Sequence, residues 1–509
     1  MAEMQQTQSE TVSTGITGLD YILHGGFQRS GFYLIQGDPG SGKTTAALQY
    51  LFAGARRNEA GLYISLTESR KDLLRTCNAH GWNLDVIQIA DLTRSEANLK
   101  SENQYSVFHP SEVELGQTTK AIFAEVDRLQ PRHVVFDGLS EMRLLAERPL
   151  RYRHQMLALK SFFEDRGITV LLLDDQTSPF GDIQPESLVG GNIVMERHLP
   201  GYGGARRRLY VTKVRGSKFQ DGYHDYDIRD GGIVVHPRLV AAEHHGNFSR
   251  EFLSSDIANL DAMMSGGLET GTTTLLLGPA GVGKSTVAMQ FVATHLIKGG
   301  HAAVYTFDEV LDTLFERSEK LCLNGVRQYV ESGHLHVRQV NPAELSPGSF
   351  AHEVRHAVEE GKAKIVVIDS LNGYLSAMPE ERFLTTHLHE LFAYLNQCGV
   401  LTIMVVAQHG MIGSMMTDID VSYMADTVVV FRYFELNGEI RQAIGVFKKR
   451  TGPHERALRE LSITTSGVRV GAPLSDFRGI MTGVPEYLGK TPGLQIEEDL
   501  LQQNEAGSQ

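Results

Sequence analysis

Two stretches decide the fold of this chain, Gly37-Asp38-Pro39-Gly40-Ser41-Gly42-Lys43-Thr44 and Gly278-Pro279-Ala280-Gly281-Val282-Gly283-Lys284-Ser285. Both fit the pattern G-x-x-x-x-G-K-[ST], and each follows an apolar run and precedes a segment with helical character. In that context the glycines let backbone N–H groups close on phosphate oxygens, and the helix N-terminus adds partial positive charge. The lysine reaches the β- and γ-phosphates, and Thr44 or Ser285 can hold Mg²⁺. We therefore predict two sites for ATP and Mg²⁺, which Thr45 and Thr286 complete.

The duplication extends beyond these loops. One constant interval separates four pairs of matching positions, which are Asp20 and Asp261, Gly26 and Gly267, Lys43 and Lys284, and Glu68 and Glu309. A repeat of this length, close to half of the chain, indicates a duplicated domain and not a solenoid. We expect two tandem α/β domains of the RecA-like P-loop class, each a mostly parallel twisted sheet flanked by helices. The predicted boundaries are a flexible N-terminus 1–13, domains 14–243 and 251–485, a linker 244–250 and a mobile acidic tail 486–509.

Composition narrows the class of protein. Hydrophobic residues make up 41% of the chain. No apolar stretch approaches the length of roughly 18 residues that a membrane-spanning helix needs. The N-terminus lacks the basic and apolar regions of a signal peptide, and the three cysteines form no C-x-x-C motif, so we expect a cytoplasmic protein with reduced thiols. The net charge of −13 argues against nucleic acid as a partner. The basic triplet Arg206-Arg207-Arg208 is interpreted as a solvated or ion-paired strand end.

A carboxylate follows the next apolar strand in each half. Glu68 and Glu309 lie at the same spacing beyond Lys43 and Lys284, at the predicted carboxyl ends of strands, where ligands bind in doubly wound sheets. A glutamate there can orient the oxygen that attacks the γ-phosphate, or take a proton from it. The alternative is an acid in the first turn of a helix, a place that Asp and Glu favour anyway.

Further along, each half has an apolar run that ends in aspartate, Arg132–Asp137 and Lys364–Asp369. After a P-loop, this is the Walker B pattern, so Asp137 and Asp369 are the predicted carboxylates of the Mg²⁺ shell. A later strand ends at Gln408, which either senses the γ-phosphate or is a plain loop amide.

Late in each half a basic strand carries K-x-R, as Lys213 and Arg215 in the first and Lys448 and Arg450 in the second. Alternation along a strand puts both cations on one face, where they repel unless an anion lies between them. A nucleotide phosphate of a neighbouring subunit would serve; solvated strand charges are the alternative.

Tandem domains with this order of motifs resemble KaiC, the double-domain RecA-type ATPase family of the circadian clock. The resemblance covers nearly the whole chain and includes the opening motif Thr14–Asp20 with Gly25-Gly26, the segment Gly438–Arg450 and the segment Phe477–Gly483. It implies a homohexamer of two stacked rings, with ATP at subunit interfaces that the K-x-R residues complete. It also implies a second ring that phosphorylates itself on Ser or Thr, and small signalling partners of the KaiB or histidine-kinase type.

The chain departs from the family pattern in two places. The paired strand-end glutamates become Thr67-Glu68 in the first half and Asp308-Glu309 in the second, so that Asp308 joins Glu309 as a candidate catalytic carboxylate. A threonine hydroxyl cannot act as a carboxylate base near neutral pH, so first-half hydrolysis must depend on Glu68. The family's adjacent Ser-Thr acceptors become Ser422-Tyr423, which leaves Ser422 as the candidate phosphoacceptor, with Thr417 as a nearby polar candidate.

Two other functions remain open from the residues alone. One is a DNA-dependent ATPase of the RecA or RadA class, although the chain has no zinc module and no terminal basic arm. The other is a scaffold that ATP assembles and that has no kinase activity, which Thr67 favours for the first half.

Overall fold

The computed structural model describes residues 11–93, 110–175, 185–201, 203–244, 246, 248–321, 325–341, 343, 345–376, 384–408 and 422–489. By its internal contacts the chain divides into two compact units. The first comprises Met1–Arg238 and Ser346–His352, and the second comprises Leu239–Leu345 and Glu353–Gln509.

The first unit is built on a nine-stranded sheet with the order β11-β10-β9-β8-β3-β7-β6-β4-β5. The strand pairs from β8 to β5 are parallel, and those from β8 to β11 are antiparallel. Its elements are β1 (Thr11–Val12), α1 (Thr17–Ile22), β2 (Phe27–Gln28), β3 (Phe32–Gly37), α2 (Lys43–Arg56), β4 (Gly61–Ser65), α3 (Arg70–Ala79), η1 (Leu84–Val86), β5 (Gln88–Asp91), α4 (Pro110–Leu129), β6 (His133–Asp137), α5 (Leu139–Ala146), α6 (Pro149–Glu164), β7 (Thr169–Asp174), η3 (Pro185–Ser187), β8 (Gly191–His198), β9 (Arg206–Val214), β10 (His224–Arg229) and β11 (Gly232–His236).

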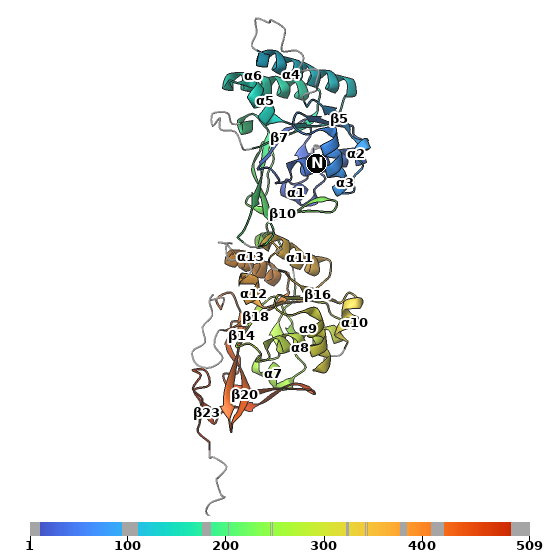
Figure 1. Ribbon diagram of the computed structural model, residues 1–509. Helices are drawn as coiled ribbons and strands as arrows, with labels where there is room; N and C mark the ends of the chain where they lie inside the picture. The colour runs from blue at the N-terminus through green and yellow to red at the C-terminus, as the bar shows by residue number, and fades with distance from the viewer. Residues whose placement is uncertain are drawn as a thin grey trace, which may run out of the picture. The chain divides into compact units, whose positions relative to one another are not determined.

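Helices cover both faces of this sheet. α1, α2 and α3 contribute to one apolar core, and α4, α5 and α6 contribute to a second core on the opposite face (Figure 1). Every residue of β3 and of β7 is buried, which is typical of parallel strands covered on both sides. Because β3, β7, β6 and β4 pair in parallel, their carboxyl ends lie along one edge of the sheet. The P-loop follows β3 at this edge.

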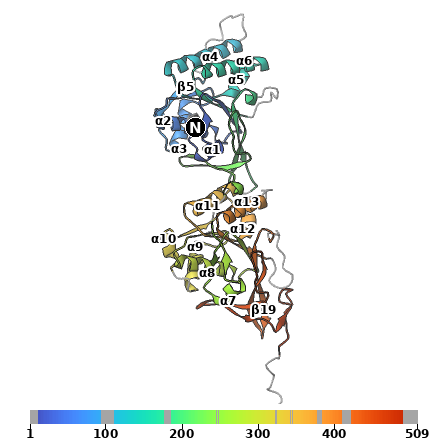
Figure 2. The same ribbon diagram turned by 180° about the vertical axis from the view of Figure 1, so that it is seen from behind.

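The second unit repeats this plan with the order β16-β15-β17-β18-β14-β19-β20-β21-β22. In this sheet order, every pair from β16 as far as β19 is parallel, and every pair from β19 to β22 is antiparallel. Figure 2 shows the two groups of helices that belong to this repeat, α7 to α10 and α11 to α13, although the first residues of α11 fall in the segment Ser346–His352 that is grouped with the first unit. Its elements are η4 (Ala241–Glu243), β12 (Phe252–Leu253), α7 (Ala258–Met263), β13 (Leu268–Glu269), β14 (Thr273–Gly278), α8 (Lys284–Ile297), β15 (Ala302–Thr306), α9 (Leu311–Lys320), α10 (Val326–Glu331), β16 (Leu335–Gln339), α11 (Pro347–Glu359), β17 (Ile365–Asp369), α12 (Leu371–Ser376), α13 (Leu384–Gln397), β18 (Leu401–Ala407), β19 (Thr427–Leu436), β20 (Glu439–Lys449), β21 (Arg459–Thr464), β22 (Gly467–Pro473), β23 (Phe477–Arg478) and β24 (Glu486–Tyr487).

The constant interval of the sequence repeat holds for whole elements. β1 through α3 of the first unit match β12 through α9 of the second at both ends, including α2 with α8 and α3 with α9. Beyond α9 the interval between matching elements becomes shorter. An example is the pair β6 and β17, which start at His133 and Ile365. The two halves therefore share one construction up to the helix that follows the strand-end acid.

The opening motif is held by one aspartate in each half. Asp20 accepts hydrogen bonds from the hydroxyls of Ser13 and Thr14, at 2.5 and 2.7 Å, and from the Thr14 backbone N–H at 2.7 Å. Asp261 accepts the same three from Ser254 and Ser255. A carboxylate near the start of a short helix thus satisfies the donors of the turn that precedes it.

A polar network ties the base of the first sheet to α2. Buried His133 lies 2.9 Å from the Tyr50 hydroxyl and 2.8 Å from Glu59, whose carboxylate also accepts hydrogen bonds from Arg29 and Arg57 at 3.0 and 2.9 Å. Burial acts to raise the pKa of Glu59, but the hydrogen bonds from Arg57, His133 and Arg29 outweigh it and lower the pKa to about 2. The negative charge of Glu59 is therefore a stabilising part of this domain.

The predicted fold class is confirmed. Two large, mostly parallel sheets with flanking helices form the tandem RecA-like α/β units. Among the described residues, no helix combines the length and the apolar character that crossing a bilayer requires.

Candidate functional site

Both P-loops adopt a backbone that glycine permits. Gly42 and Gly283, the residues before α2 and α8, have φ of +102° and +99°. A Cβ at Gly42 would lie 2.8 Å from Ile228 Cδ1, and one at Gly283 would lie 2.2 Å from Ile463 Cδ1. Each helix is thus preceded by a residue without a side chain, which leaves the first N–H groups of the helix available to an anion.

The other predicted loop residues lie where the sequence placed them. Thr45 and Thr286 are buried in the first turns of α2 and α8. The loops run between strand and helix through Asp38, Pro39, Gly40 and Ser41 in the first unit, and through Pro279, Ala280, Gly281 and Val282 in the second. Tyrosine hydroxyls hold the loop backbones, because Tyr226 donates to the Ser41 carbonyl at 2.6 Å and Tyr433 to the Ala280 carbonyl at 3.3 Å.

The two P-loop lysines differ in their partners. Lys43 Nζ donates to the Gly37 carbonyl at 2.6 Å and lies 2.7 Å from the carboxylate of Asp175, just beyond β7. Lys284 Nζ donates to the carbonyls of Gly278 and Pro279, at 2.9 and 2.6 Å. Burial lowers the pKa of Lys284 to about 8, although the nearby Asp369 carboxylate acts to raise it. Sequence reasoning did not find the partner Asp175, although its position after an apolar strand of the same sheet was a usable signal.

In the first unit the predicted acids meet beside α2. Thr44 Oγ1 donates to Glu68 Oε1 at 3.1 Å, and the Tyr63 hydroxyl donates to Asp137 at 2.7 Å. Burial raises the pKa of Glu68, and the Asp137 carboxylate raises it further. Burial likewise raises the pKa of Asp137, while hydrogen bonds from Tyr63 and, more weakly, from Thr67 act to lower it. The structure therefore brings Thr44, Glu68 and Asp137 together and places the Thr67 hydroxyl on the same cluster.

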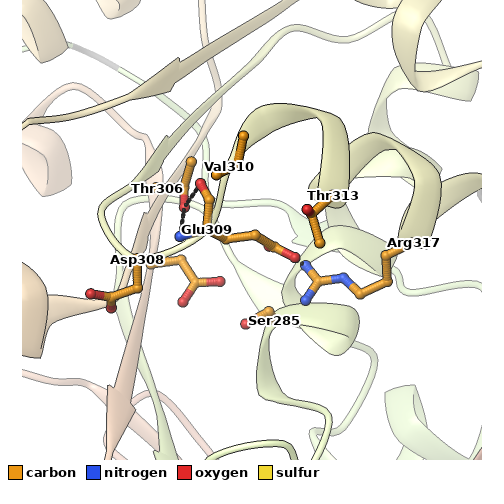
Figure 3. Close-up of a pocket in the computed structure, with 8 residues that line it drawn as sticks. Ser285, Thr306, Asp308, Glu309, Val310, Thr313 and Arg317 are labelled. Atoms are coloured by element: carbon orange, nitrogen blue, oxygen red, sulfur yellow. Dashed lines mark hydrogen bonds and ion pairs between the residues drawn. The ribbon is translucent and has the colours of Figure 1, made fainter.

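In the second unit the predicted acids line one pocket of about 360 Å³ (Figure 3). Asp308 accepts a hydrogen bond from the Ser370 hydroxyl at 2.5 Å. Burial raises the pKa of Asp369 and of Glu309. Ser285 lies close enough to Asp369 to act on the pKa of its carboxyl, which it acts to lower. The lining residues are Ser285, Thr306, Asp308, Glu309, Val310, Thr313, Arg317 and Asp369.

Arg317 is a member of this pocket that sequence reasoning missed. Its Nη2 lies 3.0 Å from Glu309 Oε2, and Figure 3 shows the guanidinium and the carboxylate pointing toward one another. Arg317 is on α9, the helix that follows the strand-end acid, two helical turns beyond Glu309. An opposite charge at that spacing was the available signal.

The K-x-R residues contact equivalent loops in the two units. Lys213 Nζ donates to the Glu186 carbonyl and Arg215 to the Ser187 carbonyl, the latter at 3.1 Å. Lys448 Nζ donates to the carbonyls of Ser422 and Ala425, at 3.0 and 2.8 Å, and Arg450 to that of Tyr423 at 2.8 Å. Arg215 and Arg450 lie one residue past the ends of β9 and β20. The observed strands are therefore shorter at this end than the sequence predicted. Within one chain, both cations bind carbonyl groups.

The candidate acceptor Ser422 is the first described residue after a gap in the description, and it is partly buried beside Tyr423, which is 52% exposed. The other acceptor candidate, Thr417, lies outside the described residues. Gln408 accepts a hydrogen bond from Arg432 at 2.5 Å, and its backbone N–H donates to the Gly278 carbonyl at 3.0 Å. The basic triplet is ion-paired at Arg208, which lies 2.7 Å from Glu196, as the sequence interpretation allowed.

The residues present suit a magnesium–nucleotide complex. Each site offers one hydroxyl from the start of a helix and one carboxylate from the end of another parallel strand of the same sheet. Mg²⁺ prefers such oxygen ligands, with water and phosphate completing its shell. Over the described ranges, no group of three or more His, Cys, Asp or Glu could hold a metal ion.

Comparison with known proteins agrees with this arrangement. A family model described as ATPase: KaiC matches residues 12–240 and again residues 253–475. The circadian clock protein KaiC3 of Synechocystis sp. is 25% identical over 497 residues, which cover 96% of this chain and 97% of that protein. The circadian clock oscillator protein KaiC of Acaryochloris marina is 24% identical, over 93% of this chain and 91% of that protein. KaiC of Thermosynechococcus vestitus is also 24% identical, over 95% and 93%. With two matches that together span most of its length, this chain belongs to the KaiC family of ATPases.

Proposed function

We propose that this KaiC-family protein hydrolyses ATP in both of its domains, 14–243 and 251–485, and phosphorylates itself through the second. The observation that carries the proposal is the pocket beside α8, in which Ser285 and Asp369 lie with Asp308 and Glu309. A metal-binding pair beside the P-loop and a pair of acids just beyond β15 of the same sheet are the parts that phosphoryl transfer requires.

The residues of the second site have separate roles in phosphate binding, metal binding and proton transfer. The backbone N–H groups before α8 and the Lys284 ammonium bind the phosphates, and Ser285 with Asp369 would hold Mg²⁺, which neutralises phosphate charge when bound. Glu309 orients the attacking oxygen and takes its proton, with Asp308 beside it. In the first domain Lys43, Thr44, Asp137 and Glu68 have the same roles, and Thr67 leaves Glu68 as the sole strand-end carboxylate.

Substitution of the proposed bases tests hydrolysis. Loss of general-base assistance typically costs roughly 10²–10⁴-fold in rate. We expect Glu309→Gln to reduce turnover to the level of the first domain and Glu309→Gln with Glu68→Gln to reduce it to near zero, while nucleotide still binds. Full turnover in the double variant would contradict the assignment.

Ser422 is the proposed acceptor of the phosphoryl group. The neighbouring cations support this proposal, because Lys448 and Arg450 donate to the backbone carbonyls of Ser422 and Tyr423. Both cations lie close enough to offset the charge of about −1.5 to −2 that a phosphate adds. Mass mapping of phosphopeptides after incubation with Mg·ATP is the test. Phosphate on Ser422 that disappears in Lys284→Ala supports the proposal, and ATP hydrolysis without phosphate on any peptide contradicts it.

The assembly that we propose is a homohexamer of two stacked rings, in which Lys213, Arg215, Lys448 and Arg450 reach the nucleotide of a neighbouring subunit. Small signalling proteins of the KaiB or histidine-kinase type are its proposed partners. Native mass spectrometry with saturating Mg·ATP should detect the hexamer, and detection of monomer alone would contradict it. Lys43→Ala should impair assembly more than Lys284→Ala if the first ring is the main site of association.

Two alternatives have distinct outcomes. A DNA-dependent ATPase of the RecA or RadA class would show hydrolysis that DNA stimulates and that falls steeply with salt. A scaffold would bind ATP and assemble without ATP turnover in the first domain. Thr67 favours this alternative for the first domain, because it replaces a strand-end carboxylate.

A further inference from the structure

We propose that Arg317 binds the terminal phosphate of ATP at the second site, and that it holds the Glu309 carboxylate only while nucleotide is absent. This inference rests on the proposed ATPase site and adds a phosphate-binding residue from within the same chain. It also makes the two sites of this protein different in kind, because Thr76 occupies the matching position in the first domain.

Geometry places Arg317 in the right position. It lines the same pocket as Ser285 and Asp369, the residues proposed to hold the metal ion of the nucleotide. The positive charge of Arg317 acts on the Asp369 carboxylate as well as on Glu309. Its guanidinium therefore contacts the strand-end acid inside the pocket that is proposed to hold the metal ion and the γ-phosphate.

The contact with Glu309 leaves donor capacity unused. Although Arg317 Nη2 lies 3.0 Å from Glu309 Oε2, it is buried and forms no hydrogen bond with any residue that the structure describes. A buried donor without a hydrogen bond is costly, and a planar guanidinium can bind a phosphate through two parallel N–H groups. The tetrahedral phosphate offers oxygens that can satisfy this donor.

Electrostatics supplies the reason for an exchange of partners. The acids Asp308, Glu309 and Asp369 line the pocket, and Arg317 is the basic residue among the lining residues. A γ-phosphate that enters carries more negative charge than one carboxylate and competes for the guanidinium. When Arg317 moves to the phosphate, the Glu309 carboxylate is released to accept a proton from the attacking oxygen.

The first domain provides an internal comparison. α3 and α9 match at both ends, so that Thr76 occupies the position of Arg317, and Asp72 occupies that of Thr313. The Asp72 carboxylate acts on Glu68, and the Thr76 hydroxyl donates to the Asp72 carbonyl at 3.4 Å. The same helix thus adds a negative charge near the first site and a positive charge at the second.

The test compares nucleotides that differ by the γ-phosphate. In the full-length chain with Lys43→Ala, which removes phosphate binding by the first P-loop, the dissociation constants of ADP and of a non-hydrolysable ATP analogue are measured with Mg²⁺. A hydrogen-bonded charge pair contributes roughly 1.5–3 kcal/mol, so Arg317→Ala should weaken analogue binding at least about tenfold relative to ADP. Arg317→Lys should restore part of the preference, and Arg317→Gln, which keeps much of the length of the side chain without its charge, should not.

Arg327→Ala is the matched control. Arg327 on α10 makes ion pairs with Glu319 and Asp312, at 3.3 and 3.6 Å, and does not line the pocket. This variant loses the same charge and should keep the analogue-to-ADP ratio. An equal ratio in Arg317→Ala, Arg317→Gln and the parent chain would overturn the inference.

A second comparison separates direct binding from an effect through Glu309. In a Glu309→Gln background, Arg317→Ala should still weaken analogue binding relative to ADP, and loss of the effect there would overturn direct phosphate binding. If neither nucleotide binds the Lys43→Ala chain at a protein concentration where native mass spectrometry detects the same oligomer as in the parent, the proposed second site itself fails. If both bind but Arg317 does not affect their ratio, only the present inference fails.

Discussion

At the proposed first site, nucleotide must compete with an ion pair of Lys43 that has no counterpart among the described contacts of Lys284. Lys43 Nζ lies 2.7 Å from Asp175, with side-chain exposures of 11% and 38%. The ammonium must leave this carboxylate, or share it, in order to bind the β- and γ-phosphates. We therefore predict that Asp175→Asn tightens nucleotide binding at the first site.

The magnitude follows from the exposure of the pair. Partly exposed ion pairs contribute up to about 1 kcal/mol, which corresponds to about fivefold in the dissociation constant. Removal of the carboxylate also removes its repulsion with the phosphates, which acts in the same direction. The expected change is therefore a decrease of about five- to tenfold in the dissociation constant.

The assay uses a fluorescent ADP analogue and the full chain with Lys284→Ala, so that binding reports on the first site. Asp127→Asn is the control, because it removes the same charge from the same domain, where Asp127 lies 2.8 Å from Arg166. The control should bind as the parent does, at a protein concentration where all variants have the same oligomeric state. An unchanged or larger dissociation constant in Asp175→Asn would refute the reasoning.

Three further predictions concern single positions. The pKa of Glu59 is about 2 in the folded protein, against an ordinary 4.5, so its charge stabilises the first domain above pH 4.5, and that contribution is lost as the pH falls toward 2. Glu59→Gln should therefore lower the free energy of unfolding at pH 7, by about 1 kcal/mol because solvent screens its partly exposed arginine partners, and the difference from the parent should shrink in acid. Urea unfolding followed by the fluorescence of Trp82, the sole tryptophan, measures it in this domain. Thr67→Glu should raise first-domain hydrolysis in a Glu309→Gln background by supplying a second strand-end carboxylate, and an unchanged steady-state rate would show that Glu68 alone suffices. Gly283→Ala should halve the nucleotide bound per chain in equilibrium dialysis, because a residue with a side chain is strained at φ of +99° and would distort the loop backbone; full occupancy would contradict this.

The sequence predicted the parts of the site whose chemistry depends on local pattern. Glycine spacing, an apolar run before the loop and a lysine after it follow from the backbone geometry that phosphate binding requires, so both P-loops could be recognised without coordinates. The repeated interval added the strand-end acids, because matching positions in a duplicated domain have matching places in the fold. The fold class and the family followed from the same motifs, and both were confirmed.

Tertiary structure decided which charges meet. Asp175 follows β7 and reaches Lys43 because β7 pairs with β3, a contact between segments far apart in the chain that no local pattern contains. The partner of Glu309 is Arg317 on the next helix, whereas the hydroxyl of Thr44 donates to Glu68 in the matching site. The two halves share their motifs but differ in these contacts, since a side chain's electrostatic partners are set by packing in three dimensions and not by its own motif.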